Sequence, residues 1–191
     1  MKSLKGTRTE MNLLASFAGE SQARNRYTFF ASVAKKEGYD RIASLFLETA
    51  ENEKYHAKEF FKFLEGGKAE ITATYPAGVI GTTEENLKAA AEGENEEHTV
   101  LYPDAAEVAE EEGFPEVAAK FRLISKVEKE HEKRYLSLLE EVREESSFRR
   151  DGNTSWVCRK CGYIHDGREA PEICPICGHP RGYFEEKKVE Y

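Results

Sequence analysis

The sequence contains no cysteine before residue 158, and all four of its cysteines lie between Cys158 and Cys177. Disulfide-stabilised secreted domains carry cysteines more densely and over more of their length, so this distribution argues against a disulfide framework. No apolar run approaches the roughly 18 residues of a membrane-spanning helix. The first residues, Met1 to Gly6, lack the apolar stretch of a signal peptide. We therefore expect a cytoplasmic protein without membrane association.

The chain also lacks an excess of positive charge. Its 28 lysines and arginines stand against 36 aspartates and glutamates, which gives a formal net charge of −8. That balance argues against nucleic acid and anionic membranes as partners, although bound metal ions would offset part of it. Hydrophobic residues make up 39% and charged residues 34% of the 191 positions, which is typical of a helix-rich protein of one or two domains.

Apolar residues recur at helical spacing over most of the chain, which predicts a mostly α-helical bundle. Gly38 marks a helix end, and Thr82 with Glu85 forms a capping box that begins a third helix. Pro103 predicts that this helix ends or kinks near Tyr102. A connection over residues 68–81 is long for adjacent helices, so we expect it to cross the end or side of the bundle. The expected helices cover residues 9–36, 40–64, 82–102, 104–112 and 115–145.

The pattern changes after a polar break over residues 146–155. Beyond it the segments are short, rich in turns and contain aromatic residues. We therefore expect two domains, a helical one over residues 1–147 and a small one of short strands and turns over residues 153–191. Trp156, Tyr163 and Phe184 would supply the core that so small a domain needs.

Glutamates and histidines share the apolar faces of the expected helices. An unpaired ionised carboxylate in a core costs many kcal/mol, so such groups persist when they are paired or bind metal. Residues three apart on a helix point the same way, so the two Glu-x-x-His pairs can each bind one ion. Four helices that bear Glu, Glu-x-x-His, Glu and Glu-x-x-His are what a carboxylate-bridged two-metal site requires, with ligands suited to iron or manganese. The candidate ligands are Glu20, Glu53, His56, Glu94, Glu97, Glu128 and His131.

The ligands also recur at a nearly constant offset in the numbering. This offset is 74 from Glu20 to Glu94 and 75 from Glu53 to Glu128, and it is 75 again between the two histidines that follow them. Little else matches between the halves, so we interpret the repeat as two helix pairs about a pseudo-two-fold axis. Any one glutamate could lie on a solvated face or in a buried salt bridge, but the whole set favours metal. We expect His98 at the surface, and His165 and His179 in structural or solvent-facing positions.

The cysteines form two Cys-x-x-Cys pairs, Cys158 with Cys161 and Cys174 with Cys177. Each pair can present two thiolates to one tetrahedral ion. A glycine follows each pair and permits a tight turn whose backbone N–H groups point at sulfur. The spacing alone leaves open whether the ion is zinc, in a structural ribbon, or iron, in a one-electron carrier.

These motifs together resemble the rubrerythrin family over nearly the whole chain. The resemblance implies a ferritin-like four-helix bundle with a non-haem di-iron centre, followed by a rubredoxin-like domain with one iron bound by four cysteines. It favours iron over zinc at the cysteines, although zinc substitution stays possible. It also implies a peroxidase that reduces hydrogen peroxide to water in the cytoplasm of an anaerobic or microaerophilic microbe. The matching motifs are Gly19–Tyr27, Lys62–Gly67, Gly93-Glu94-x-x-Glu97, Glu53-x-x-His56, Glu128-x-x-His131, Cys-x-x-Cys-Gly-Tyr and Cys-Pro-x-Cys-Gly.

The resemblance implies a role for each ligand. Glu53 and Glu128 would bridge the two irons, and His131 would bind one of them. The other iron would bind Glu97 when oxidised and His56 when reduced, which would open a place for peroxide. Glu97 has no counterpart in the first half, where Ala23 occupies the equivalent position. Glu20, Glu94 and Glu97 would be terminal carboxylate ligands. Tyr27 and Tyr102 would either donate hydrogen bonds to the ligand carboxylates or the bound peroxide, or simply pack in the core.

The family also implies partners. Electrons would come from a separate donor protein, either a rubredoxin or an NAD(P)H-dependent reductase. A head-to-tail homodimer would place the cysteine site of one subunit beside the di-iron site of the other. The alternatives are a ferroxidase or iron-storage protein, a manganese or iron oxidase acting on an organic substrate, and a zinc-ribbon interaction protein.

Overall fold

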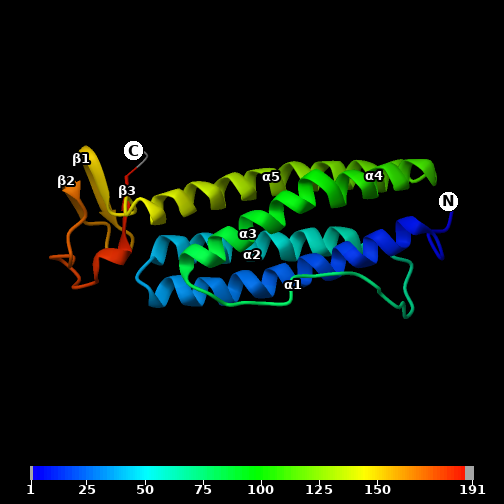
Figure 1. Cartoon of the computed structure of the whole chain (residues 1–191), viewed down its shortest axis with the longest axis horizontal. Coiled ribbons are helices and arrows are strands. Elements are labelled where there is room, and N and C mark those ends of the chain that lie inside the picture. The colour runs from blue at the N-terminus through cyan, green and yellow to red at the C-terminus, as the bar shows by residue number, and fades with distance from the viewer. Residues whose placement is uncertain (1, 188–191) are drawn as a thin grey trace.

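The computed structural model describes residues 2–187, and over that range it is a long helical bundle with a small sheet at one end (Figure 1). No helix within this range is both long and apolar enough to cross a membrane. The bundle elements are α1 (Arg8–Lys36), α2 (Asp40–Phe61), α3 (Thr83–Glu96), the π-helix η1 (Glu97–Leu101), α4 (Tyr102–Glu111) and α5 (Pro115–Arg143).

Local sequence signals set most of the helix ends. Thr82 accepts a hydrogen bond from the backbone N–H of Glu85, whose carboxylate accepts one in return, so the predicted capping box is confirmed. α5 begins at Pro115, as predicted. α2 ends at Phe61, earlier than expected, because the next residues turn through i→i−3 hydrogen bonds, including Leu64 N–H to Phe61 O at 3.1 Å.

Pro103 does not break the third rod of the bundle. α3 runs directly through η1 into α4, and the N–H of Tyr102 donates to the carbonyl of Glu97, five residues back. This wide turn, called a π-turn below, absorbs an additional residue without ending the helix. The third helix and the short helix expected after it are therefore one rod, and with α1, α2 and α5 it makes the four-helix bundle.

Two hydrophobic clusters fill the bundle, one toward each end. Phe30, Phe46 and Leu138 belong to the cluster nearer the sheet, and Phe60 and Phe121 to the cluster nearer the N-terminus. The buried glutamates lie in a polar layer between these clusters. Charged groups in such a layer are shielded from water on both sides along the bundle axis.

The connection between α2 and α3 runs back along the outside of α1 (Figure 1). Tyr75 fixes it there, since its hydroxyl donates to the carbonyl of Ala15 at 2.6 Å. The Tyr75 ring packs over Gly19, where an added Cβ would lie 3.4 Å from it, an ordinary van der Waals distance. The predicted crossing along the side of the bundle is confirmed.

The small sheet is antiparallel with strand order β2-β1-β3, from β1 (Arg149–Cys158), β2 (Ile164–Glu169) and β3 (Phe184–Glu186). Trp156 and Phe184 are fully buried within it and Tyr163 partly, as predicted for its core. The polar break ends earlier than expected, because β1 already pairs with Glu169 of β2 at Arg149.

The sheet docks on the turn between α1 and α2. The guanidinium of Arg159 lies 2.8 Å from the carboxylate of Asp40, at the first residue of α2. Tyr39 in the same turn stacks on Phe148, with ring centroids 6.0 Å apart. Gly182 lies against the backbone of Gly38 so closely that a Cβ there would overlap its carbonyl. These contacts place the cysteines beyond the Asp40 end of the bundle.

Candidate metal centres

Two sets of four potential ligands lie in the polar layer and share two members. One set comprises Glu20, Glu53, His56 and Glu128, and the other comprises Glu53, Glu94, Glu128 and His131. Within each set, the donor atoms lie within 4.8 Å of one another. They come from α1, α2, α5 and the third rod, so all four bundle elements contribute. The i,i+3 spacing in α2 and α5 puts each histidine beside its own glutamate.

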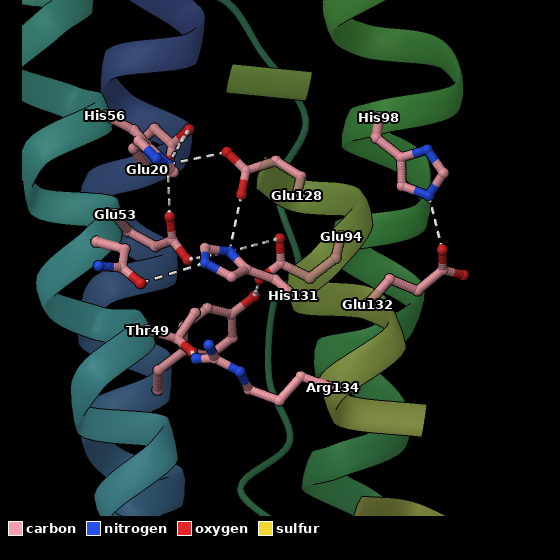
Figure 2. Close-up of polar contacts among 12 residues, drawn as sticks. Glu20, Thr49, Glu53, His56, Glu94, His98, Glu128, His131, Glu132 and Arg134 are labelled. Atoms are coloured by element: carbon pink, nitrogen blue, oxygen red, sulfur yellow. Dashed lines mark hydrogen bonds and ion pairs between the residues drawn. The ribbon is translucent and has the colours of Figure 1, made fainter. Parts of the chain in front are cut away.

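The two shared glutamates lie between the two histidines (Figure 2). Glu53 approaches His56 Nδ1 with one oxygen, at 2.9 Å, and His131 Nδ1 with the other, at 3.3 Å. Glu128 does the same, at 2.9 Å from His56 Nδ1 and 2.8 Å from His131 Nδ1. A carboxylate that divides its oxygens between two sites has the geometry of a bridge between two metal ions.

These close contacts are not hydrogen bonds. Among residues 2–187, eight buried oxygen and nitrogen atoms of this layer have no partner in hydrogen-bond geometry. Native proteins rarely leave buried polar atoms unpaired, so converging unpaired lone pairs indicate metal ligands. The eight atoms are Glu20 Oε2, both carboxylate oxygens of Glu53, His56 Nδ1, Glu94 Oε2, both carboxylate oxygens of Glu128, and His131 Nδ1.

The crowded charges of the layer shift the pKa values of several of its groups. Burial, together with the charges of Glu128 and Glu53, raises the pKa of Glu20 well above its usual value. Burial and the charge of Glu53 raise the pKa of Glu94 to about 8. Burial alone would lower the pKa of His131, but the neighbouring carboxylates of Glu128, Glu53 and Glu94 raise it to about 12. Metal cations in the same place would remove this excess of negative charge.

Two buried tyrosines support the carboxylates that only one set uses. The hydroxyl of Tyr27 on α1 donates to Glu94 Oε1 at 2.6 Å, and that of Tyr102 on α4 donates to Glu20. Each tyrosine therefore supports the carboxylate of the opposite half. This exchange confirms the pseudo-two-fold relation between the halves that the repeated offset predicts.

The π-turn explains why the repeat offset grows by one within the second half. Tyr27 follows Glu20 by seven residues, whereas Tyr102 follows Glu94 by eight. The additional residue of the second half lies in η1, where hydrogen bonds span five residues. The sequence carried this signal in its offsets, but only the structure places it.

Glu97 begins η1 and belongs to neither four-ligand set. Burial, followed by the charges of Glu94, Glu128 and Glu53, nevertheless raises the pKa of its carboxyl well above the usual value. The positive charge of Arg26 acts to lower the pKa of the same carboxyl. In this structure His56, not Glu97, completes the Glu20 set.

His98 was predicted at the surface, but only 12% of its side chain is exposed. Its Nε2 lies 2.6 Å from a carboxylate oxygen of Glu132 on α5, to one side of the ligand layer (Figure 2). Asn95 donates to the same carboxylate at 2.8 Å. This pair holds η1 against α5, a function that the sequence pattern did not reveal.

A cavity of about 280 Å³ leads toward Glu97. It lies between α1, the third rod and the connection that carries Tyr75, and Gly19, Arg26 and Tyr102 line it. A larger cavity of about 740 Å³ lies between the bundle and the sheet, and none of the candidate ligands lines it. Position relative to the ligands, not size, makes the smaller cavity the candidate route to the bundle site.

The four cysteines face one another at the end of the sheet. Sγ of Cys158 lies 3.7 Å from that of Cys177, and Sγ of Cys161 lies 3.6 Å from that of Cys174. A tetrahedral ion with metal–sulfur bonds of about 2.3 Å sets sulfur atoms about 3.8 Å apart. The sulfur positions therefore fit one tetrahedral metal ion.

Two matching turns build this cysteine site. The N–H of Gly162 donates to Cys158 O at 2.8 Å, and that of Gly178 donates to Cys174 O at 2.9 Å. Both glycines have positive φ, 76° and 70°, a region that side chains disfavour. Burial acts to raise the pKa of Cys174, but backbone N–H groups at its sulfur bring it to about 7. A backbone N–H acts to lower the pKa of Cys161, whereas burial and the neighbouring thiols raise it to about 12. His179 and His165 are half-buried and belong to no group of metal-ligating residues found within residues 2–187.

Comparison with known proteins agrees with both metal centres. The sequence model of the Rubrerythrin family matches residues 11–139, and that of the "Rubrerythrin, rubredoxin-like domain" matches residues 156–185. The chain is 64% identical to a rubrerythrin of Porphyromonas gingivalis over 190 residues, which cover all of this chain and 95% of that protein. It is 53% identical to a rubrerythrin of Nitratidesulfovibrio vulgaris, over 97% of each chain.

Solved structures show the same architecture. The fully reduced, all-ferrous state of nigerythrin superposes with a TM-score of 0.64 at 31% identity, over 97% of this chain and 92% of that one. A bacterioferritin of Desulfovibrio desulfuricans matches 73% of this chain with a TM-score of 0.63. Its identity is 21%, so that likeness concerns the bundle fold alone. The chain therefore belongs to the rubrerythrin family, with a di-iron site in its helical bundle and a rubredoxin-like iron site at its four cysteines.

Proposed function

We propose that the chain is a cytoplasmic peroxidase that reduces hydrogen peroxide to water, with electrons relayed from a donor protein through the cysteine site. The observation that carries this proposal is the pair of four-ligand sets that share Glu53 and Glu128 beside a cavity that reaches Glu97. One hydrogen peroxide molecule takes up two electrons and two protons to give two water molecules. Two adjacent ferrous ions would supply those electrons, one each, and polarise the oxygen–oxygen bond.

The residues of the chain would bind the ions and handle the protons. Glu53 and Glu128 would bridge, and Tyr102 and Tyr27 would hold Glu20 and Glu94 in place through their hydroxyl groups. The remaining ligands would be His131 on the Glu94 side and either His56 or Glu97 on the other.

Glu97 has the properties of a proton donor to the departing oxygen. Burial raises the pKa of its carboxyl well above the usual value, and the same carboxyl lies at the wall of the access cavity. The apolar clusters above and below the layer would exclude bulk water from the reacting group. A small, uncharged substrate such as hydrogen peroxide suits this narrow and largely enclosed site.

Replacing Glu97 with alanine tests the proposal. We expect E97A to lose peroxidase turnover while the absorption of the cysteine-bound iron stays unchanged. Glu107 on α4 is exposed, so E107A is a matched control that should retain full turnover. Wild-type turnover in E97A would remove Glu97 from the mechanism.

The distance between the two sites supports a head-to-tail homodimer as part of this proposal. Asp40 and Glu53 are 13 residues apart on α2, which at about 1.5 Å per residue is about 20 Å. The cysteines lie beyond Asp40, so a relay within one chain would have to cover still more. Ile173 and Ile176 near the cysteines are 63% and 70% exposed, which gives this end an apolar face for the second copy.

Mixing two inactive variants tests the relay between subunits. C174S keeps an intact bundle site, and E97A keeps an intact cysteine site. We expect each variant alone to be inactive with the donor protein, and unfolded and refolded mixtures to regain part of the activity. If the mixture stayed inactive while wild-type protein survived the same refolding, transfer between subunits would be excluded.

The shared bundle fold also allows a ferroxidase or iron-handling role. Such a role needs no electron input through cysteine, so ferrous oxidation by C174S would stay at the wild-type rate. Peroxide turnover driven by the donor protein would be lost in the same variant if the relay peroxidase is right.

A further inference from the structure

The two histidines of the bundle site are held differently on the side that faces away from the metal. His131 is 3% exposed, and its Nε2 lies 3.3 Å from Oδ1 of Asn52 on α2. His56 is 12% exposed. Among the hydrogen bonds within residues 2–187, Nε2 of His131 has this contact with Asn52, and none involves Nε2 of His56. Both rings present Nδ1 to the ligand layer, so Nε2 must carry the proton when Nδ1 binds metal.

The internal repeat explains this difference. The offset in the numbering that relates His56 to His131 also relates Asn52 to Val127. Asn52 precedes His56 by four residues on α2 and contacts the histidine of α5. Val127 precedes His131 by four residues on α5, so by the same pseudo-two-fold relation it is the counterpart of Asn52 for His56. A valine side chain cannot accept a hydrogen bond, and this one is 39% exposed.

We propose that Asn52 is a positioning residue that fixes the ring of His131, and that Val127 at the equivalent place leaves the ring of His56 free. An acceptor on the far nitrogen of a metal-binding histidine sets its tautomer and orientation and strengthens it as a ligand. The Glu94 set is therefore the rigid, tighter site, and the Glu20 set is the weaker, adjustable one. The choice between His56 and Glu97 falls on the side where the chain omits this acceptor.

This inference rests on the proposed function only in that both sets hold metal, and its test needs no peroxide. The full chain, with zinc at its cysteines and the bundle site emptied, is titrated with Co²⁺ under calorimetry. We expect two binding steps of different affinity. Substituting Asn52→Val should weaken the tighter step by about 10–100-fold and leave the weaker one unchanged. Substituting Asn52→Asp keeps an acceptor and should retain the tight step.

The reciprocal substitution tests the other half. Val127→Asn should strengthen the weaker step severalfold, while Val127→Ala should not change it. Proton NMR of the Co²⁺ form gives a second readout, because each metal-bound histidine shows an exchangeable Nε2–H signal. The Nε2–H signal of His131 should persist in water, and that of His56 should exchange quickly. N52V should speed the exchange of the His131 proton at least tenfold. V127N should slow the exchange of the His56 proton.

Two equal Co²⁺ affinities in the wild type, or an unchanged tight step in N52V, would overturn the proposal. If N52V failed to fold, the comparison of V127N with V127A would still test the proposal, because residue 127 is half-exposed and tolerates substitution. N52D would then test whether an acceptor at residue 52 keeps the tight step. Normal Co²⁺ behaviour with no peroxidase activity would instead count against the proposed function and leave this inference intact.

Discussion

Tyr27 and Glu94 come from different halves of the chain, yet the tyrosine hydroxyl donates to the buried carboxylate at 2.6 Å. Tyr102 makes the reciprocal bond to Glu20. The carboxylate ligands of each half are thus held by the other half, so the two helix pairs have to assemble before either half of the site is complete.

Replacing Tyr27 with phenylalanine should weaken metal binding more than it disturbs the fold. The change leaves Glu94 Oε1 buried without a donor, which costs about 1–3 kcal/mol. Tyr55 is 53% exposed on α2, so Y55F is the matched control. We expect chelators to remove bundle iron faster from Y27F than from Y55F or wild type. Equal rates would show that the hydrogen bond does not support the ligand.

Replacing Gly182 with alanine should loosen the cysteine-bearing unit from the bundle. A Cβ there would overlap the carbonyl of Gly38, so the turn of residues 181–183 must move away. Gly152 has no atom within 4 Å of an added Cβ, which makes G152A the control. Limited proteolysis should cleave G182A near residues 144–149 sooner than G152A. Unchanged proteolysis would mean that the unit docks through other contacts.

The metal-free protein should lose stability as pH rises. Burial and the charge of Glu53 raise the pKa of Glu94 from 4.5 to about 8 in the folded state. Burial would lower the pKa of His56, but Glu128 and Glu53 raise it from 6.5 to about 9. Both groups hold more protons when folded than when unfolded, so their contribution fades between pH 4.5 and 9.

Thermal unfolding followed by circular dichroism from pH 5 to pH 9 measures this effect. Metal-free wild type should show a falling Tm, and metal-free E94Q a flatter profile. The iron-loaded protein should not follow the same slope, because the metal displaces these protons. A flat Tm in metal-free wild type would contradict the prediction.

Glu112 ties the start of α1 to the end of α4. It accepts from the backbone N–H of Thr9 at 2.8 Å and from the Thr9 hydroxyl at 2.6 Å, and these bonds lower its pKa to about 2. Its neighbour Glu111 is 66% exposed, and among residues 2–187 its one ion-pair partner is Arg8. We expect E112A to lower Tm by several degrees and E111A to change it little. Equal effects would mean that the surface charge, not the cap on α1, matters.

Much of the fold and most of the ligand set could be predicted because they depend on local patterns. The Thr82 capping box, Pro115 and the i,i+3 pairs act within one helical turn. The two-metal arrangement was predicted from the glutamates and histidines on the inward helix faces, with the repeated spacing as support, and the reciprocal tyrosine bonds agree with that repeat. The sequence could not reveal contacts that join distant segments, such as Asn52 with His131 or His98 with Glu132, because nothing in either segment specifies the other.

Pro103 shows a second kind of limit. Because proline has no backbone N–H, it predicted a break in the helix. The π-turn just before Pro103 changes the hydrogen-bond spacing at this point, and Pro103 then lies in the first turn of α4, where its missing N–H is tolerated. The rod therefore continues. The division into domains over residues 1–147 and 153–191 stays a prediction. In the structure, β1 begins between these two ranges, at Arg149.

The turn over residues 97–101 shows where this chain tolerates a change of length. One residue added to a regular helix rotates everything after it by about 100°. A residue gained between Glu94 and Tyr102 in a regular helix would have turned Tyr102 away from Glu20. In this chain the wide turn takes up the gain, and Tyr102 still donates to Glu20 as Tyr27 does to Glu94. A homologue one residue shorter at this point should have an uninterrupted helix here.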